Sequence, residues 1–369
     1  MKRNALLFAL ASATAAILVS CGTARPVSKL AVEEFDIENV GTRQFLEEVD
    51  YAADTAYTLS YAREYHKERG ANDKALPVRI SWQGDAAKIV LSTSPKFKDG
   101  IEVPASAAPA EIYNLIPDVI YYYNVYGTDG KVLKTGCVKP VGPLRWINGI
   151  AENVRDLGGW KADGGHIAYG KLYRGARLSS RMPQSGRDIF LKDLGISVDL
   201  DLRGIKESEA RVGKVIEGAD YLKFPVEKNL GRGTGNTQEL YQQAIRAIIG
   251  YLGEGRSVYF HCAGGADRTG SLAFLIEALL GVSESDLSKD YELTTFAGTN
   301  TRLRNFRATE KETHILYELI NHVRKYGDPQ TMSINELVLN WATTRHSDEV
   351  EPLSLQEIEL LRKYMIVKD

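Results

Sequence analysis

Hydrophobic and polar positions alternate with two different periods along the chain, and the change of period divides it in two. In the first part, short alternating runs such as residues 78–82 are separated by Gly, Pro, Asn and Asp, as in antiparallel β-strands. In the second part, the strand runs 196–202 and 257–260 alternate with helical runs such as 238–252. The pattern predicts a smaller all-β sandwich followed by an α/β domain whose central sheet is flanked by helices.

We expect a targeting segment at residues 1–21, a sandwich at 28–140 and the α/β domain at 146–369. Residues 115–125 combine a Leu, a Pro and alternating tyrosines, and they resemble the corner before the penultimate strand of fibronectin type III domains. The hydroxyl of Tyr121 is expected to tie this corner to the backbone. A module of this type binds or spaces partners, so a protein or a glycan is its expected partner.

The targeting segment has two basic residues, an apolar run at 5–19 and the sequence Leu-Val-Ser-Cys ending at Cys21. This resembles the lipobox of bacterial lipoproteins, whose cysteine is lipidated. The run is shorter than the about 20 apolar residues of a spanning helix. By resemblance to lipoprotein sorting, Gly22 indicates the outer membrane, with the periplasmic face as the default and Cys21 as the sole membrane contact. The alternative is a signal peptide or anchor with an accidental cysteine.

Composition limits the classes of partner and cofactor. The 369 residues carry a formal net charge of -2, so nothing global indicates nucleic acid, and attraction for phosphate must be local. Three cysteines (Cys21, Cys137 and Cys262) are too few for a disulfide framework. Cys137 is expected to be a small buried residue, although pairing with Cys262 stays open. The histidines outside the segment discussed next show no metal-ligand spacing, and no metal or cofactor is expected.

One segment carries the chemistry, with the sequence His-Cys-Ala-Gly-Gly-Ala-Asp-Arg-Thr-Gly over residues 261–270. It joins a predicted strand to a predicted helix through a loop of small residues. Amides of such a loop converge, and the helix N-terminus favours negative charge, so the segment predicts an anion cradle. The residues whose backbone is expected to bind the substrate phosphate are Ala263, Gly264, Gly265 and Ala266.

Four side chains of this segment have predicted roles. The field of the loop should lower the pKa of Cys262, whose thiolate would attack phosphorus and form a phosphocysteine. Arg268 can hold two phosphoryl oxygens in a bidentate fork. The hydroxyl of Thr269 can hydrogen-bond the sulfur, and His261 is expected to order the loop from behind through hydrogen bonds.

The Cys-x5-Arg pattern, with His before it and Thr-Gly after it, resembles the signature of protein tyrosine and dual-specificity phosphatases. Asn-Val-Arg-Asp-Leu-Gly-Gly at 153–159, Leu-Tyr-Arg-Gly-Ala at 172–176 and Asp-Leu-Arg at 201–203 precede it. Together these motifs resemble the bacterial tyrosine/serine phosphatase family, from about residue 146 onward. The resemblance implies the cysteine-phosphatase fold, no metal, and activity on phosphotyrosine, extending to phosphoserine, phosphothreonine and phosphoinositides.

The resemblance also implies that Asp267, directly before the loop arginine, is the general acid that protonates the leaving oxygen and then activates water. Other cysteine phosphatases take the acid from an upstream loop, where this chain offers only Glu227, so Glu227 stays the alternative. Family members usually carry Lys where this chain has Ala266, and the missing charge weakens the expectation of phosphoinositide or polyphosphate activity.

Arginine–carboxylate motifs upstream of the loop allow two interpretations. Arg155 and Asp156 are expected to brace loops of the α/β domain. For Arg203, a contact with the substrate and a bracing role stay equally open.

Three functions follow from these residues. The first is metal-independent phosphomonoester hydrolysis through a phosphocysteine, on phosphorylated proteins (tyrosine or dual specificity) or on small phosphomonoesters. The second is hydrolysis of inositol phosphates, phosphoinositides or sugar phosphates by the same loop. The third is a non-catalytic phosphate-binding lipoprotein, against which the complete set of Cys262, Asp267, Arg268 and Thr269 argues.

Overall fold

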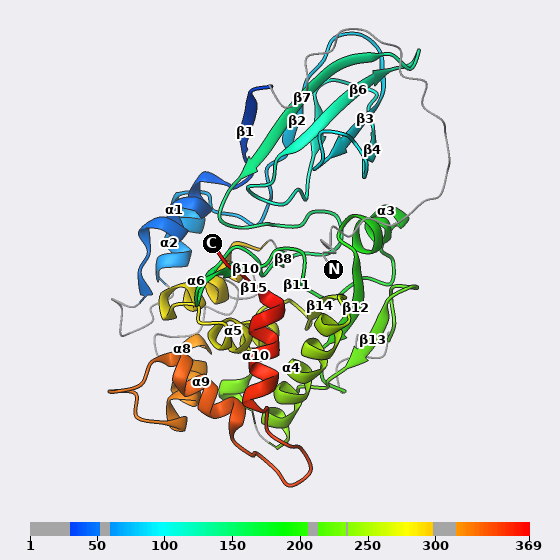
Figure 1. Cartoon of the computed structure of the whole chain (residues 1–369). Helices are drawn as coiled ribbons and strands as arrows, with labels where there is room; N and C mark the ends of the chain where they lie inside the picture. Colours follow the sequence, from blue (N-terminus) through cyan, green and yellow to red (C-terminus); the bar gives the residue numbers. More distant parts are fainter. Residues whose placement is uncertain (1–29, 52–59, 206–212, 234, 298–314) are drawn as a thin grey trace. The chain divides into compact units, whose positions relative to one another are not determined.

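The computed structural model describes residues 30–51, 60–205, 213–233, 235–297 and 315–369 (Figure 1). Backbone contacts divide the chain into two units. The α/β unit contains Asn39–Lys74 and Trp146–Asp369, and the sandwich unit contains Ala75–Arg145 and the described residues up to Glu38. The predicted targeting segment with Cys21 lies outside the described residues. Within the described ranges, none of the helices has the length and apolar character needed to cross a membrane.

The division differs from the predicted ranges at residues 39–74, which the sequence pattern places with the sandwich. The contacts of this segment assign it to the α/β unit. Its buried Phe45 packs edge-on against Phe296, with ring centroids 5.0 Å apart. The α/β unit is therefore built from two stretches of chain that are separated in sequence by residues 75–145. The segment contains α1 (Val40–Glu48) and α2 (Ser60–Glu68).

The described strands of the sandwich unit form two sheets that enclose one apolar core. The larger sheet has the order β1-β7-β6-β3-β4, and the smaller one pairs β2 with β5. Side chains of Val78, Ile89, Tyr123 and Val138 meet in the core and come from both sheets. The predicted all-β region is confirmed. Its strands are β1 (Val32–Asp36), β2 (Val78–Ile80), β3 (Ala86–Ser92), β4 (Ile101–Pro104), β5 (Ala110–Ile112), β6 (Tyr121–Gly127) and β7 (Val132–Val141).

Two predictions within the sandwich unit concern single side chains. The hydroxyl of Tyr121 accepts a hydrogen bond of 3.0 Å from the backbone N–H of Ile116, which confirms the predicted corner. Cys137 is buried in β7, as expected, and its thiol is free. Beyond this corner, the resemblance to fibronectin type III domains stays a prediction.

The α/β unit is organised by a five-stranded sheet of order β13-β12-β14-β11-β8, in which β8 is the antiparallel edge strand. Strands β11 and β14 are buried along their whole length, as expected where both faces of a parallel sheet are covered. These strands are β8 (Arg155–Asp156), β11 (Leu172–Gly175), β12 (Ile196–Asp201), β13 (Asp220–Lys223) and β14 (Ser257–His261). A small antiparallel sheet contains β9 (Lys161–Ala162), β10 (Gly165–Ile167) and β15 (Ile366–Val367).

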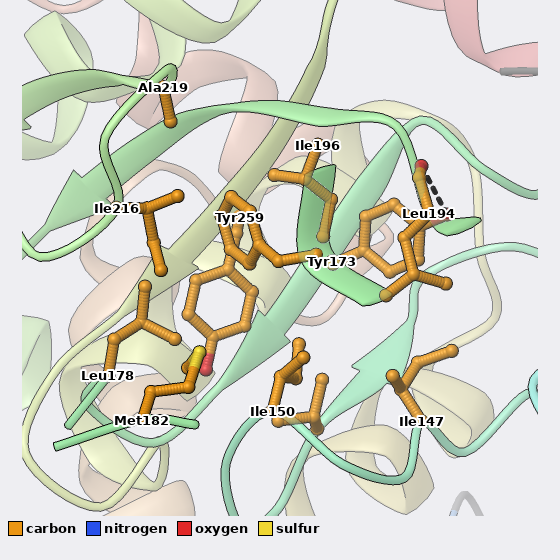
Figure 2. Packing of buried hydrophobic residues seen from close by; sticks show 12 residues of the cluster. Ile147, Ile150, Tyr173, Leu178, Met182, Leu194, Ile196, Ile216, Ala219 and Tyr259 are labelled. Carbon is orange, nitrogen blue, oxygen red and sulfur yellow. Dashed lines mark hydrogen bonds between the residues drawn. The ribbon is translucent and has the colours of Figure 1, made fainter. Parts of the chain in front are cut away.

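Helices pack against this sheet and fix the ends of its strands. Figure 2 shows one core of the unit, where Tyr173 of β11 and Tyr259 of β14 lie together with Ile150, Met182 and Ile196. Both α4 and α5 contact β14, so the connection from β14 to α5 is anchored on each side. The described helices are α3 (Gln184–Asp188), α4 (Thr237–Gly253), α5 (Asp267–Leu279), α6 (Glu284–Glu292), α8 (Ile315–Val323), α9 (Ile334–Thr343) and α10 (Leu355–Met365).

Candidate active site

The predicted anion loop connects the end of β14 at His261 to the start of α5 at Asp267. Its carbonyl oxygens are all occupied by donors that lie around the loop. They accept hydrogen bonds from His261 Nδ1 (to Cys262 O, 3.0 Å), Arg177 N (to Ala263 O, 3.1 Å), Asn153 Nδ2 (to Gly264 O and Gly265 O, both 3.1 Å) and Arg174 Nη2 (to Gly265 O, 3.2 Å).

A trans peptide directs its N–H opposite to its C=O, so these contacts turn the next four amides inward. The amides of residues 263–266 donate to no acceptor within the described ranges, and they are free to meet an anion. Gly265 is required by the turn, because its φ is +66° and an added Cβ would lie 2.4 Å from the backbone carbon of Gly175. The N-terminus of α5 adds its partial positive charge, and the loop can therefore hold an oxyanion.

Cys262 lies at the entrance of this loop with a free thiol. Burial by itself raises the pKa of the thiol, but the positive charge of Arg268 and the hydroxyl and amide of Thr269 outweigh it. The pKa of Cys262 is therefore lowered from its usual value. The buried hydroxyl of Thr269 has no conventional hydrogen-bond partner among the described residues, which leaves it available to the thiolate.

Arg268 is in the first turn of α5, where its side chain is half-buried and its charge acts on the sulfur of Cys262. Its Nη1 donates to the carbonyl oxygen of Val226 at 3.2 Å, and its own carbonyl accepts from the hydroxyl of Tyr241 at 3.1 Å. These contacts fix both ends of the residue. The guanidinium is thereby placed beside the nucleophile, as a bidentate phosphate ligand requires.

His261 is fully buried behind the loop, and both of its ring nitrogens face acceptors. Nδ1 donates to the carbonyl of Cys262, and Nε2 lies 3.0 Å from a carboxylate oxygen of Asp199. Burial lowers the pKa of His261, but the charges of Asp199 and Asp201 raise it above its usual value overall. The His261 ring therefore orients the first peptide of the loop through its contact with the carbonyl of Cys262.

The two candidate acids occupy different surroundings. Asp267 is the first residue of α5, and its charge opposes ionisation of Cys262, so it lies within electrostatic reach of the sulfur. Glu227 is exposed, and its carboxylate accepts a hydrogen bond of 3.1 Å from the backbone N–H of Ile205. A Cβ added at Gly204 would lie 2.5 Å from this carboxylate. Glu227 thus holds the adjacent backbone, which favours Asp267 as the acid.

Arg203 is buried and donates two parallel hydrogen bonds to Asp201, from Nε to Oδ1 at 2.9 Å and from Nη2 to Oδ2 at 2.8 Å. Tyr221 and Lys223 also donate to Asp201. The contacts in the structure are those of a bracing residue at the end of β12. A contact of Arg203 with substrate stays a prediction.

Asn153, Arg174 and Asp290 contribute to the site. Asn153 and Arg174 lie in motifs that carry the family resemblance, but the sequence predicts no role for them, and it does not single out Asp290. Arg155 and Arg174 both bind the buried carboxylate of Asp290, with Arg155 Nε at 2.8 Å. Because Asp290 lies on α6, far along the chain, only the folded topology brings it to the two arginines. Asp156 accepts from the backbone N–H groups of Gly158 and Gly170, which is the bracing contact expected of it.

Metal ligands form no group in this part of the molecule. Within the described ranges, no three or more His, Cys, Asp or Glu side chains are arranged to hold a metal ion.

Comparison with known proteins finds a relative by sequence. A protein of Cupriavidus necator, assigned by its name to the tyrosine-protein phosphatases, is 29% identical over 165 residues. The match covers 38% of this chain and 59% of that relative, so the chain spans less than two thirds of the length of its relative.

Solved structures with similarity include the core catalytic domain of the PP-IP phosphatase SIW14 from S. cerevisiae in complex with citrate. It is 16% identical with a TM-score of 0.29, over 47% of this chain and 93% of that chain. PTPMT1 is 13% identical with a TM-score of 0.24, over 53% of this chain and 89% of that chain. The description "Tyrosine phosphatase family" belongs to the sequence profile that matches residues 148–344, which is more than half of the chain and contains the whole loop. The chain belongs to the tyrosine phosphatase family.

Proposed function

We propose that this protein is a cysteine-dependent phosphatase that hydrolyses phosphomonoesters through a phosphocysteine intermediate. One observation carries the proposal: the same loop has amides that face inward, a cysteine whose pKa is lowered, and an arginine beside it. The amides of residues 263–266 and the guanidinium of Arg268 would hold the three non-bridging oxygens of the phosphoryl group. These donors stabilise the charge that develops on those oxygens in the transition state.

In the first step, the thiolate of Cys262 attacks phosphorus, and the bond from phosphorus to the leaving oxygen breaks. The protonated carboxyl of Asp267 donates its proton to that oxygen, so the alcohol or phenol leaves neutral. The products of the step are the free alcohol, a phosphocysteine and an ionised Asp267.

In the second step, a water molecule attacks the phosphocysteine, and Asp267 accepts its proton. The bond from sulfur to phosphorus breaks, inorganic phosphate leaves, and the thiolate of Cys262 returns. The hydroxyl of Thr269 and the charge of Arg268, which lower the pKa of the thiol, also make the sulfur a better leaving group.

We infer that the substrate is a phosphorylated protein and that phosphotyrosine is the preferred phosphorylated residue. The family description supports this class, and the loop itself adds a second reason. Ala266, which is buried, brings no side-chain charge beside the bound phosphate, so a single phosphoryl group suits the loop better than a polyphosphate. Inositol phosphates, phosphoinositides and sugar phosphates are the competing substrates.

The location of the protein is a separate proposal that rests on its first 21 residues alone. We propose that Cys21 is lipidated and anchors the chain to the outer membrane, and that the sandwich unit binds a protein or glycan partner. Cys21→Ala should move the full-length protein from the membrane fraction to the soluble fraction. Retention of that variant in the membrane fraction would disprove the anchor.

The test of the activity is hydrolysis of para-nitrophenyl phosphate in the presence of EDTA, with vanadate as inhibitor. Cys262→Ser should lower kcat by about 10⁴-fold or more while phosphate binding survives, since the nucleophile alone is removed. Cys137→Ser is the matched control and should keep wild-type turnover. Normal turnover by Cys262→Ser would show that the nucleophile is another group. A panel of phosphopeptides, phosphoinositides and inositol phosphates then ranks the substrates.

A further inference from the structure

We propose that Asn153 and Asp73 are positioning residues for the phosphate loop, and that the segment 39–74 acts on the catalytic site through Asp73. The inference rests on the proposed function and extends it to a segment outside the family match at 148–344. Asp73 acts on the loop through one intermediate residue. Its carboxylate accepts a hydrogen bond from the backbone of Asn153, and the Asn153 side chain donates hydrogen bonds to the loop. We call this pair of contacts the relay.

Asn153 is the central contact of this relay. Its Nδ2 donates to the carbonyl oxygens of Gly264 and Gly265, both at 3.1 Å, and lies 3.2 Å from Thr294 Oγ1. Its Oδ1 accepts from Arg155 Nη1 at 2.9 Å. A guanidinium can only donate, so the contact with Arg155 fixes which end of the amide faces the loop.

The backbone of Asn153 has a φ of +56°, a left-handed conformation that costs most residues energy. Asparagine tolerates it better than most side chains, and the surroundings must still hold it there. The carboxylate of Asp73 accepts the backbone N–H of Asn153 at 3.3 Å. Asp73 thus stabilises the conformation from which the Asn153 amide reaches two peptides at once.

Residues 39–74 are attached to the α/β unit at points other than Asp73. Lys289 of α6 donates to the carbonyl of Leu46 at 2.8 Å, and the backbone N–H of Tyr51 donates to Ser285 Oγ at 3.0 Å. These contacts, with the packing of Phe45 on Phe296, dock the segment independently of the relay. The role of Asp73 can therefore be tested without removing the segment.

The consequence for catalysis follows from the geometry of a peptide. As long as the carbonyls of Gly264 and Gly265 are held, the amides of Gly265 and Ala266 face the phosphate. If the hydrogen bonds from Asn153 are lost, the Gly265 carbonyl keeps its hydrogen bond from Arg174 Nη2, but the Gly264 carbonyl loses its donor. The peptide between Gly264 and Gly265 can then rotate and present its carbonyl oxygen to the anion. A carbonyl oxygen that faces the oxyanion repels it and raises the energy of the transition state. The same rotation removes an inward N–H, so the loop stabilises the thiolate of Cys262 less.

The experiment measures kcat/KM for para-nitrophenyl phosphate and the pH dependence of Cys262 alkylation by iodoacetamide in four full-chain variants. Asn153→Gly keeps the left-handed backbone without the amide, and kcat/KM should fall about 10²-fold. Asp73→Ala should cost about 10-fold, and Asp73→Asn, which still offers an accepting oxygen, should recover most of it. In Asn153→Gly and Asp73→Ala the alkylation midpoint should move to higher pH.

Glu48→Ala is the matched control. It removes a carboxylate of the same segment whose described partners, Arg69 at 2.8 Å and Tyr65 at 2.7 Å, do not touch the loop. Wild-type kinetics and alkylation in this variant are expected. If Asp73→Ala matches Glu48→Ala in both readouts, or Asn153→Gly alters only thermal stability, the relay is disproved. If the wild type neither hydrolyses the ester nor shows early alkylation of Cys262, the proposed function fails instead.

Discussion

Two free cysteines occupy the two units of this protein, and they are buried almost equally, at 3% exposure for Cys262 and 4% for Cys137. Burial raises the pKa of Cys137, whose thiol lies in β7 near the backbone carbonyls of Leu30 and Ala31. The pKa of Cys262 is lowered, although burial acts on it in the same direction. Burial therefore does not decide reactivity in this chain. The charge of Arg268 and the hydroxyl and amide of Thr269 set the direction of the pKa shift of Cys262.

The largest change to this comparison should come from Arg268→Gln. The variant removes the main charge that ionises Cys262 and also the bidentate ligand of the phosphoryl group, so kcat/KM should fall about 10³-fold. The alkylation midpoint of Cys262 should rise toward that of Cys137. Kinetics with an aryl phosphate and alkylation at several pH values measure both. A loss of turnover without any change in the alkylation midpoint would show that Arg268 does not lower the pKa of Cys262.

Asp267→Asn should lower the alkylation midpoint of Cys262 and also lower turnover, whereas Arg268→Gln raises the midpoint. The charge of Asp267 opposes ionisation of Cys262, so its removal should lower the pKa of the thiol further. Turnover should nevertheless fall about 10²-fold for esters with poor leaving groups, because the proton donor is lost. Glu227→Gln serves as the control and should leave leaving-group dependence unchanged. The reverse result would assign the acid to Glu227.

Selective alkylation is the next smaller effect. At pH 7 the lowered pKa of Cys262 increases its thiolate fraction, and the raised pKa of Cys137 decreases its own, so iodoacetamide should modify Cys262 at least about 10-fold faster. The ratio should shrink as the pH rises, because the thiolate fraction of Cys262 saturates at lower pH than that of Cys137. Mass spectrometry of peptides after timed quenching gives both rates. Equal rates at pH 7 would contradict the comparison.

The smallest effect concerns the sandwich unit. Tyr121→Phe leaves the partly buried N–H of Ile116 without its acceptor and should lower the free energy of unfolding by about 1 kcal/mol. Urea denaturation measures this loss. Because the hydroxyl lies in the unit of Cys137, kcat should stay at the wild-type value, and a parallel loss of turnover would show that the two units are coupled.

The sequence predicts well what is local. One continuous stretch supplies the end of β14, the loop and the start of α5, so the positions of His261, Cys262 and Arg268 follow from hydrophobic period and glycine placement. The corner at Tyr121 is predictable for the same reason, since its partner lies five residues away.

The contacts that hold the loop from behind are not local and could not be predicted in this way. Asn153 reaches Gly265 over 112 positions, and Arg155 reaches Asp290 over 135. The assignment of residues 39–74 to the α/β unit could not be predicted for a similar reason. An amphipathic pattern shows that Phe45 is buried, but it does not show which core buries it.

The order of synthesis gives the split α/β unit a further consequence. As the chain emerges from the ribosome, every described strand of the sandwich unit is present once residue 145 has been made. By then α1 can pack on α2, but its partners from the later part of the α/β unit are still missing. Lys289, which donates a hydrogen bond to the carbonyl of Leu46, is made 243 positions later. During that interval the side of Phe45 that packs on Phe296 is uncovered, and exposed apolar surfaces are what chaperones bind. The nascent protein should therefore depend on chaperones through its first helix, long after its first domain is able to fold.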